Sequence, residues 1–387
     1  MYISISYFLL LSVALILYYL FPIRYRWVVL LAGSIFFYIH EDIDGILFLC
    51  LMIVLSYGGS LIIEKMRSDC ISKTKRKAGF ILVIIMVLMP LIINRTLTVL
   101  IPISERRPSF ISLLTSLGVS FYTLQMVAYL SDIYLDRTDA CRNFFKYFLF
   151  ISFFPQILQG PIPRYGLMDS LFDGHRFNPD NIVKGFQLII WGVFLKLVIA
   201  DRAGIFVDMI FNDPDRYQGC YVLMAGILYS VQLYADFSSC VCIARGSAEM
   251  FGIYLTDNFS RPYFADSIKD FWRRWHITLS RFLRDYVYIP LGGNRKGSFR
   301  KYLNIMITFL VSGVWHGGGL NYFFWGFLHG FYQIAGELLE PVNGFICRLL
   351  KFSGHTRLIR LFSIMATCFL SMTAWIIFRA ESLKKGL

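Results

Sequence analysis

Long runs of apolar residues recur along the sequence, and they constrain the fold more than any other feature. A helix needs roughly 20 apolar residues to cross a bilayer. Apolar runs, several of them too short to cross without a bend or a partner, occupy residues 2–20, 27–39, 45–63, 79–93, 110–130, 144–157, 182–200, 221–234, 303–314, 322–338 and 361–378. With 57% hydrophobic residues, 16% charged residues and a mean hydropathy of +0.58, the chain has more apolar surface than one water-soluble core can bury. The sequence therefore predicts an all-α polytopic membrane protein with about ten or eleven membrane-embedded helices.

The organisation of the chain favours a single domain. The first ten residues, "MYISISYFLL", lack the basic region of a cleavable signal peptide, and the apolar run that they begin is too long for one, so we expect it to stay in the membrane. Neither an internal repeat nor a long polar linker divides the sequence. We therefore expect one integral-membrane domain over residues 1–387.

The net charge of +13 is best read through the positive-inside rule, and not as a sign of nucleic-acid binding. The linker with Arg24 and Arg26 is basic, the linker at residues 41–45 ("EDIDG") is acidic, and the linker with "KTKRK" at residues 73–77 is basic again. This alternation places the N-terminus outside the cytoplasm. The "ERR" at residues 105–107 departs slightly from the pattern.

A proline-rich stretch, "FFPQILQGPIPRYG" at residues 153–166, interrupts the apolar pattern. Proline removes a helical hydrogen bond, and irregular backbone at membrane depth is tolerated only where protein or a water-filled cavity satisfies it. Two interpretations stay open, an ordinary interfacial loop and a re-entrant element that lines a cavity.

The most unusual segment is residues 257–299. Its middle, residues 267–289, spaces Phe271, Trp275, Leu279 and Phe282 as on one helix face, with charged residues between them, and Ser267 precedes it as an N-terminal cap. This pattern predicts one amphipathic helix, whose ordinary role is to lie at the membrane interface. The turn "LGGNRKG" that follows, at residues 291–297, is glycine-rich and basic, and such a turn can bind phosphate.

Two of the six histidines differ from the rest. His40, His175 and His355 are in polar stretches and are expected to be solvated, while His329 is as compatible with a structural as with a functional role. His276 ends "WRRWH", and His316 lies in "VSGVWHGGGL". Polar and ionisable groups at membrane depth are functional candidates by default.

The surroundings of His316 favour a functional role. We expect the three glycines after it to let a substrate approach closely, and Trp315 to form a flat apolar wall. G-x-S-x-G, HExxH and Walker motifs are absent from the sequence, and the cysteines form no CxxC pair, so no metal is predicted. Direct transfer, with histidine as general base for a hydroxyl group, is the chemistry that remains.

The segments "FFPQILQGPIPRY", "DFWRRWHITLSRFLRDYVYIPLGGNRKG", "VSGVWHG" and "FWGFLHG" together resemble the membrane-bound O-acyltransferase (MBOAT) family, from about Val119 to the end. Within it they are most similar to the alginate O-acetyltransferase subgroup. The resemblance implies a ring of helices with short re-entrant and interfacial helices, in which donor and acceptor reach one histidine from opposite faces. It also implies that His316 and His276 are catalytic.

The resemblance implies the substrates and partners as well. The donor would be acetyl-CoA or another acyl thioester, no cofactor would be bound, and the acceptor would be a cell-surface polysaccharide, reached directly or through a secreted or membrane-anchored acetyltransferase. We expect the donor and substrate contacts to come from Trp315, Arg273, Arg274, Arg284, Asp285, Asn294 and Arg295. The location would be the bacterial cytoplasmic membrane, in contact with lipids and not with nucleic acid.

The sequence departs from the subgroup in two places. After "YADFS" at residues 234–238 the subgroup continues Gly-Tyr-Ser-Asp, whereas this chain has Ser239, Cys240, Val241 and Cys242. The missing aspartate leaves the acceptor open. The chain also ends at Leu387, where such relatives continue through another membrane segment, so we expect a C-terminal helix to be missing.

Two alternatives stay open. One is D-alanyl transfer to teichoic acid by the same chemistry. The other is a polytopic transporter or flippase, in which broken helices line a passage. Inverted repeats would favour a transporter, and the sequence shows none.

Overall fold

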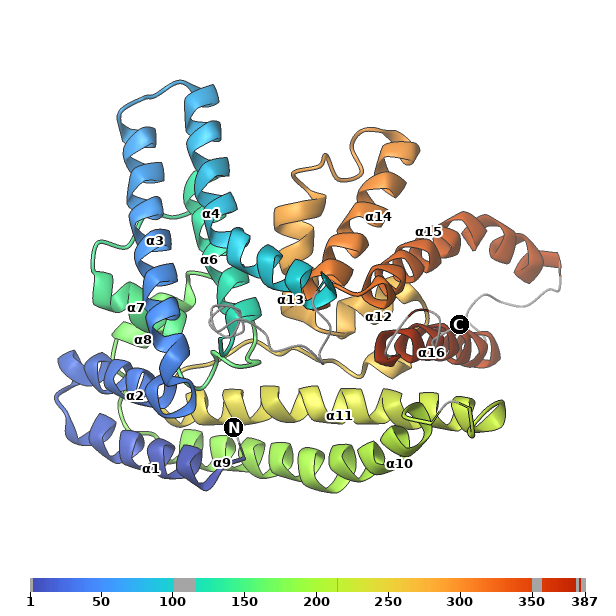
Figure 1. The fold of residues 1–387 in the computed structure, drawn as a ribbon, viewed down its shortest axis with the longest axis horizontal. Coiled ribbons are helices and arrows are strands. Elements are labelled where there is room, and N and C mark those ends of the chain that lie inside the picture. The colour runs from blue at the N-terminus through green and yellow to red at the C-terminus, as the bar shows by residue number, and fades with distance from the viewer. Residues whose placement is uncertain (1–2, 101–115, 214, 350–356, 381–382, 384–387) are drawn as a thin grey trace. The chain divides into compact units, whose positions relative to one another are not determined.

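The computed structural model describes residues 3–100, 116–213, 215–349, 357–380 and 383, and every regular element in these ranges is a helix (Figure 1). Residues 105–107 ("ERR") and His355 lie outside the described ranges. The chain divides into two compact units, Met1–Phe194 with Ser239–Thr256, and Leu195–Ser238 with Asp257–Leu387. Each unit is described by itself below, and a single domain over residues 1–387 stays a prediction.

The first unit contains most of the helices of the N-terminal half. They are α1 (Ile5–Leu20), η1 (Ile23–Tyr25), α2 (Arg26–Glu41), α3 (Ile43–Ser68), α4 (Lys73–Leu100), α6 (Val119–Tyr134), α7 (Phe144–Ser152), α8 (Leu167–Phe172) and α9 (Pro179–Phe194). The helices α3 and α4 pack side by side as a hairpin (Figure 1). Local sequence explains where α1 begins, because the Ser4 hydroxyl accepts the backbone N–H of Tyr7 at 3.1 Å and caps the helix.

The acidic linker between α2 and α3 has a structural role as well as a charge. Asp42 accepts the backbone N–H of Gly45 at 2.9 Å and thereby caps α3. Its second carboxylate oxygen accepts the N–H of Leu117 at 2.7 Å, just before α6. One side chain therefore starts α3 and holds the chain that enters α6, while the backbone N–H of Asp42 ends α2 by donating to the carbonyl of Tyr38.

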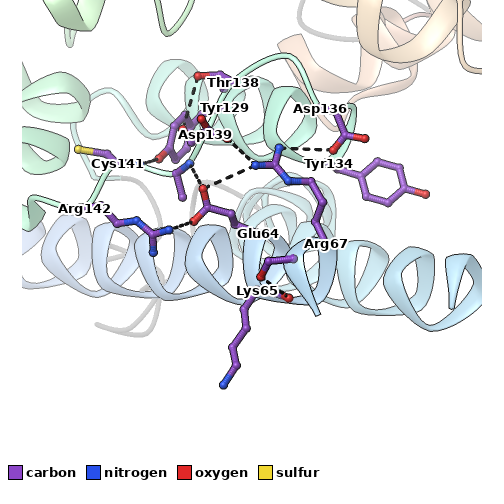
Figure 2. Close-up of polar contacts among 12 residues, drawn as sticks. Glu64, Lys65, Arg67, Tyr129, Tyr134, Asp136, Thr138, Asp139, Cys141 and Arg142 are labelled. Carbon is purple, nitrogen blue, oxygen red and sulfur yellow. Dashed lines mark hydrogen bonds and ion pairs between the residues drawn. The ribbon is translucent and has the colours of Figure 1, made fainter. Parts of the chain in front are cut away.

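A group of charged residues holds the opposite end of α3 (Figure 2). The buried Glu64 carboxylate accepts the backbone N–H of Ala140 at 3.1 Å and pairs with Arg142 at 2.6 Å. Arg67, one turn later, pairs with Asp136 and Asp139 in the same loop. The loop that follows α6 is thus fixed to the end of α3 by ion pairs and by a hydrogen bond.

The first part of the proline-rich stretch is buried, while Gln159, Arg164 and Gly166 are exposed. From Phe153 to Leu158 every residue is buried, and the backbone is irregular. The N–H of Phe154 donates to the Ser34 hydroxyl of α2 at 3.1 Å, and the Gln156 side chain donates to Gln125 of α6 at 3.4 Å. A hydroxyl group of α2 therefore binds one backbone N–H of this stretch, as the re-entrant interpretation expects, and the choice between a re-entrant element and an interfacial loop stays a prediction.

The second unit contains the C-terminal helices and the middle of the chain. They are η2 (Leu195–Ala200), α10 (Asp201–Phe211), most of α11 (Cys220–Met250), η3 (Pro262–Phe264), α12 (Ile268–Arg274), α13 (Ile277–Leu283), η4 (Arg284–Tyr288), α14 (Gly297–His316), α15 (Leu320–Leu349) and α16 (Arg357–Arg379). Its core is rich in aromatic side chains, among them Trp272, Trp275, Trp325 and Trp375.

Glycines bring α14 and α15 into backbone contact. A Cβ atom on Gly313 would lie 2.4 Å from the carbonyl oxygen of Tyr322, and one on Gly326 would lie 2.5 Å from that of Phe309. Small residues at facing positions are the usual means by which membrane helices approach closely. The helix that ends at His316 is therefore fixed against α15.

Five stretches of the described chain are long and apolar enough to cross a membrane: α3, residues 73–97 of α4, the continuous helix 179–211, α11 and α16. The prediction of an all-α polytopic membrane protein is confirmed. The larger number of about ten or eleven embedded segments, and their arrangement in a ring, stay predictions.

Candidate active site

His316 is the last residue of α14, and its partly exposed imidazole is surrounded by aromatic rings. The indole of Trp325 on α15 lies 5.1 Å away between ring centroids, and the ring of Phe378 on α16 lies 5.3 Å away, both edge-on. Three helices of the second unit thus converge on this side chain.

The glycine behind His316 does not leave space for a substrate. A Cβ atom on Gly317 would lie 2.2 Å from the ring of Tyr322, so that ring occupies the position that the sequence suggested for a ligand. The space beside Gly317 is therefore filled by protein, and a substrate approach over the neighbouring Gly318 stays a prediction. The role of Gly317 is to let Tyr322 pack against the end of α14.

The amphipathic segment is not one helix. α12 ends at Arg274, α13 begins at Ile277, and the residues after Leu283 form a π-helical turn. The predicted cap is present, because the Ser267 hydroxyl accepts the N–H of Asp270 at 3.2 Å. The predicted continuity over residues 267–289 is wrong, since His276 has a φ of 43° and a left-handed residue cannot continue a right-handed helix.

Asn258 accounts for the break between α12 and α13 and for the position of the proton on the ring of His276. Its side-chain oxygen accepts the N–H and the hydroxyl of Thr278, each at 3.0 Å, so the start of α13 is bound to it. His276 Nδ1 lies 3.3 Å from the same oxygen. An oxygen that accepts a backbone N–H offers only lone pairs, so Nδ1 of His276 must carry the proton and donate.

His276 is neutral in this environment. Burial, together with the nearby imidazole of His316, lowers the pKa of His276 well below its ordinary value of 6.5. With the proton on Nδ1, the lone pair of the ring is on Nε2. His276 is therefore arranged to accept a proton or a hydrogen bond.

Trp315 connects the two predicted catalytic histidines. Its indole lies 6.2 Å from the ring of His276 and 4.7 Å from that of His316. On its other side, His276 contacts the ring of Phe237 of α11 at 4.7 Å. The structure thus brings together three residues that the sequence had selected as site residues, from two segments forty positions apart.

Most of the predicted donor-binding residues on α12 and η4 already have ion-pair partners. Arg274 pairs with Asp270 at 2.7 Å, and Arg284 pairs with the buried Asp285 at 2.8 Å. Arg273 is exposed. Arg284 is exposed although it is paired, so Arg273 and Arg284 are more accessible to an anionic group than the half-buried Arg274.

Asn294 and Arg295 occupy an exposed turn before α14. Gly292 and Gly293 in this turn have positive φ angles of 111° and 57°. The carbonyl of Gly293 accepts the side-chain amide of Asn304 of α14 at 2.8 Å, which fixes the turn to the helix that carries His316. The structure describes no contact between Asn294 or Arg295 and either histidine.

The remaining histidines have different environments. His40 is exposed, as predicted. His175 is not simply solvated, because its ring packs against Gly252 and its Nε2 lies 2.7 Å from the carbonyl oxygen of Ser170. His329 is fully buried on α15. Within the described ranges no group of three or more His, Cys, Asp and Glu side chains is placed to hold a metal ion.

Sequence reasoning missed Asn258 and Trp325. Asn258 lies 18 positions before His276, and no local pattern indicates that its side chain would turn toward that ring. Trp325 belongs to the motif "FWGFLHG", which could have marked it as a site residue. Helical spacing alone, however, does not show which aromatic ring of this motif faces His316.

The fold and this histidine site agree with comparison to known proteins. A profile of the membrane-bound O-acyltransferase family matches residues 140–378, and the chain belongs to that family. It is 37% identical over 302 residues to the peptidoglycan O-acetyltransferase of Helicobacter pylori, covering 71% of this chain and 56% of that protein. It is 32% identical over 385 residues to the probable alginate O-acetylase AlgI of Pseudomonas aeruginosa, covering 97% and 71%. A more distant relative, at 26% identity, is the teichoic acid D-alanyltransferase of Bacillus subtilis.

Proposed function

We propose that this chain moves an acetyl group from a cytoplasmic thioester, acetyl-CoA or an acyl carrier, to a hydroxyl group of an extracytoplasmic polysaccharide or peptidoglycan. Transfer is direct or passes through a secreted or membrane-anchored acetyltransferase. The observation that carries the proposal is the pair His276 and His316 on one indole, inside the matched family region. The names of the two relatives at more than 30% identity support acetyl transfer over D-alanyl transfer.

In the proposed reaction, His316 accepts the proton of the acceptor hydroxyl group as its oxygen attacks the thioester carbonyl carbon. The new C–O bond forms, the C–S bond breaks, and the leaving thiolate takes up the proton from the imidazolium. Because Nδ1 of His276 donates to Asn258, this ring has no N–H left to polarise the carbonyl while it is neutral. We assign His276 to the acceptor side, where its Nε2 lone pair orients the hydroxyl group.

The donor side of the proposal uses the exposed basic groups. Arg295 and Asn294 lie on the glycine-containing turn that leads into α14, and Arg273 and Arg284 are exposed on α12 and η4. Guanidinium groups bind phosphate oxygens through paired hydrogen bonds. These four side chains are proposed to bind the phosphates of the donor.

The proposed orientation follows from charge. Arg67, Arg76 and Arg142 gather at the end of α3, next to the basic residues 73–77, while Asp42 and Asp44 lie at its start. By the positive-inside rule the basic end is cytoplasmic. The N-terminus is then extracytoplasmic, in the bacterial cytoplasmic membrane.

The decisive experiment replaces the proposed base. His316→Ala should lower acetyl transfer from labelled acetyl-CoA to envelope polymer by about 10²-fold or more, because general-base assistance is lost. Membranes that contain the full chain, its envelope acceptor and any partner protein serve as the assay. His40→Ala is the matched control, since His40 is exposed. Normal acetylation by His316→Ala, or movement of intact substrate across vesicles without label on the acceptor, would overturn the proposal.

A further inference from the structure

His329 is buried with 0% exposure inside the aromatic core of the second unit, and the reaction described above does not use it. The indole N–H of Trp272 donates to Nδ1 of His329 at 3.2 Å. Because an indole nitrogen only donates, Nδ1 of His329 must hold a lone pair. In the neutral ring the proton is therefore on Nε2, which is the opposite of the arrangement in His276.

Three ring N–H groups in this core have no hydrogen-bond partner in the part of the chain that the structure describes: Nε2 of His329, Nε1 of Trp325 and Nε1 of Trp375. The side chains of His329 and Trp325 have 0% exposure. A buried donor left unpaired costs about 1–3 kcal/mol, so a native protein keeps such groups for a reason.

Two of these donors are near the proposed base. Trp325 and His329 are four positions apart on α15 and therefore share one face of the helix, with ring centroids 4.9 Å apart. The indole of Trp325 also lies 5.1 Å from the ring of His316. One tryptophan thus separates the partly exposed histidine from the buried one.

The chemistry of this pair selects its ligand. Two neighbouring neutral N–H donors that lack an acceptor suit an oxygen atom that only accepts, and a carbonyl oxygen that gains negative charge fits best. We propose that His329 Nε2–H and Trp325 Nε1–H donate hydrogen bonds to the oxygen of the acyl carbonyl during transfer. The inference rests on the proposed function and adds the oxyanion-stabilising group that His276 does not provide.

The electrons balance without proton transfer from the donors. As the hydroxyl oxygen adds to the carbonyl carbon, the carbonyl π electrons move onto the acyl oxygen, where the two N–H groups bind it. When the C–S bond breaks, these electrons return to the carbonyl. Both donors keep their protons throughout.

Substitution of His329 by residues with amide side chains can distinguish the roles of its two nitrogen atoms. His329→Gln places its amide near the Nε2 position and keeps a donor there, whereas His329→Asn places its amide near Nδ1 and keeps only the partner of Trp272. We expect His329→Asn to lower kcat by about 10²-fold with little change in the KM for the thioester, because the bond forms in the transition state. His329→Gln should retain activity within about 10-fold of the wild type.

Two tryptophan variants provide the matched comparison. Trp325→Phe removes a donor that we assign to the substrate, while Trp272→Phe removes one that points at Nδ1 of His329. We expect kcat to fall by at least about 10-fold in Trp325→Phe and less in Trp272→Phe. If the kcat of Trp272→Phe and of His329→Gln falls as far as that of His329→Asn, the losses report disturbed packing around His329 and not the loss of a donor at Nε2. The inference then fails.

A dithioester donor tests the inference independently of how the variants pack. Sulfur in place of the carbonyl oxygen accepts hydrogen bonds weakly, so the ratio of thioester to dithioester rates should be large in the wild type and smaller in His329→Asn. Equal ratios in the two proteins would overturn the inference. If His316→Ala loses activity while His329→Asn keeps it, only this inference fails and the proposed function stands.

Discussion

At the scale of single residues, the site depends on which nitrogen atom of each histidine carries a proton. An asparagine oxygen fixes the proton of His276 on Nδ1, and an indole N–H fixes that of His329 on Nε2. One ring can therefore accept where the other can only donate. Neither assignment is visible in the motifs "RWH" and "LHG" themselves, because each partner comes from a different part of the chain.

A carboxylate at position 258 should change the pH dependence of activity. In Asn258→Asp the new charge favours the imidazolium form and raises the pKa of His276 from its lowered value. Since the proposed role needs the neutral ring, the acidic limb of the kcat/KM profile should move to higher pH. The profile of the purified variant in detergent measures this. An unchanged acidic limb would show that His276 does not act in its neutral form.

Part of the site could be predicted from sequence at this scale. Trp315, His276 and His316 were selected because polar groups are rare in apolar surroundings, and the structure places them together. Asn258 could not be found in this way, since an asparagine in a polar stretch carries no signal. Gly317 was misjudged because a glycine can make room for a neighbouring ring as readily as for a ligand.

At the scale of helices, the break between α12 and α13 shows the limit of periodicity. Phe271, Trp275, Leu279 and Phe282 are all buried, as their spacing predicts. Nevertheless the helix is interrupted, because Asn258 binds the backbone at Thr278 and His276 takes a left-handed conformation. The spacing of apolar residues therefore indicates which side chains are buried, even where the helix has a short break.

The close approach of α14 and α15 gives a prediction at this scale. Gly326→Ala should separate the helices, destabilise the protein by about 1–3 kcal/mol and displace Trp325 from His316. Gly336→Ala on the same helix is the matched control, because a Cβ atom there meets nothing within 4 Å. Thermal unfolding in detergent and acetyl transfer are measured together. Equal stability and activity for the two variants would contradict the importance of this contact.

At the scale of the whole molecule, composition was sufficient to predict a helical membrane protein, while charge alternation gives an orientation that can be tested. Cys70 is exposed just after α3, and the exposed Asp44 lies at the start of the same helix. The two positions should face opposite sides of the membrane.

In spheroplasts, a membrane-impermeant maleimide should label Asp44→Cys, made in a Cys70→Ser background, because that end of α3 is predicted to be extracytoplasmic. The native Cys70 should react only after permeabilisation. Mass spectrometry of the purified chain locates the label. Labelling of Cys70 in intact spheroplasts would reverse the proposed orientation.

The buried proline-rich stretch has a consequence for biogenesis. The two side chains that bind it, Ser34 and Gln125, belong to helices that leave the ribosome earlier. Synthesis from the N-terminus therefore makes both of these binding partners before the stretch that they bind is made.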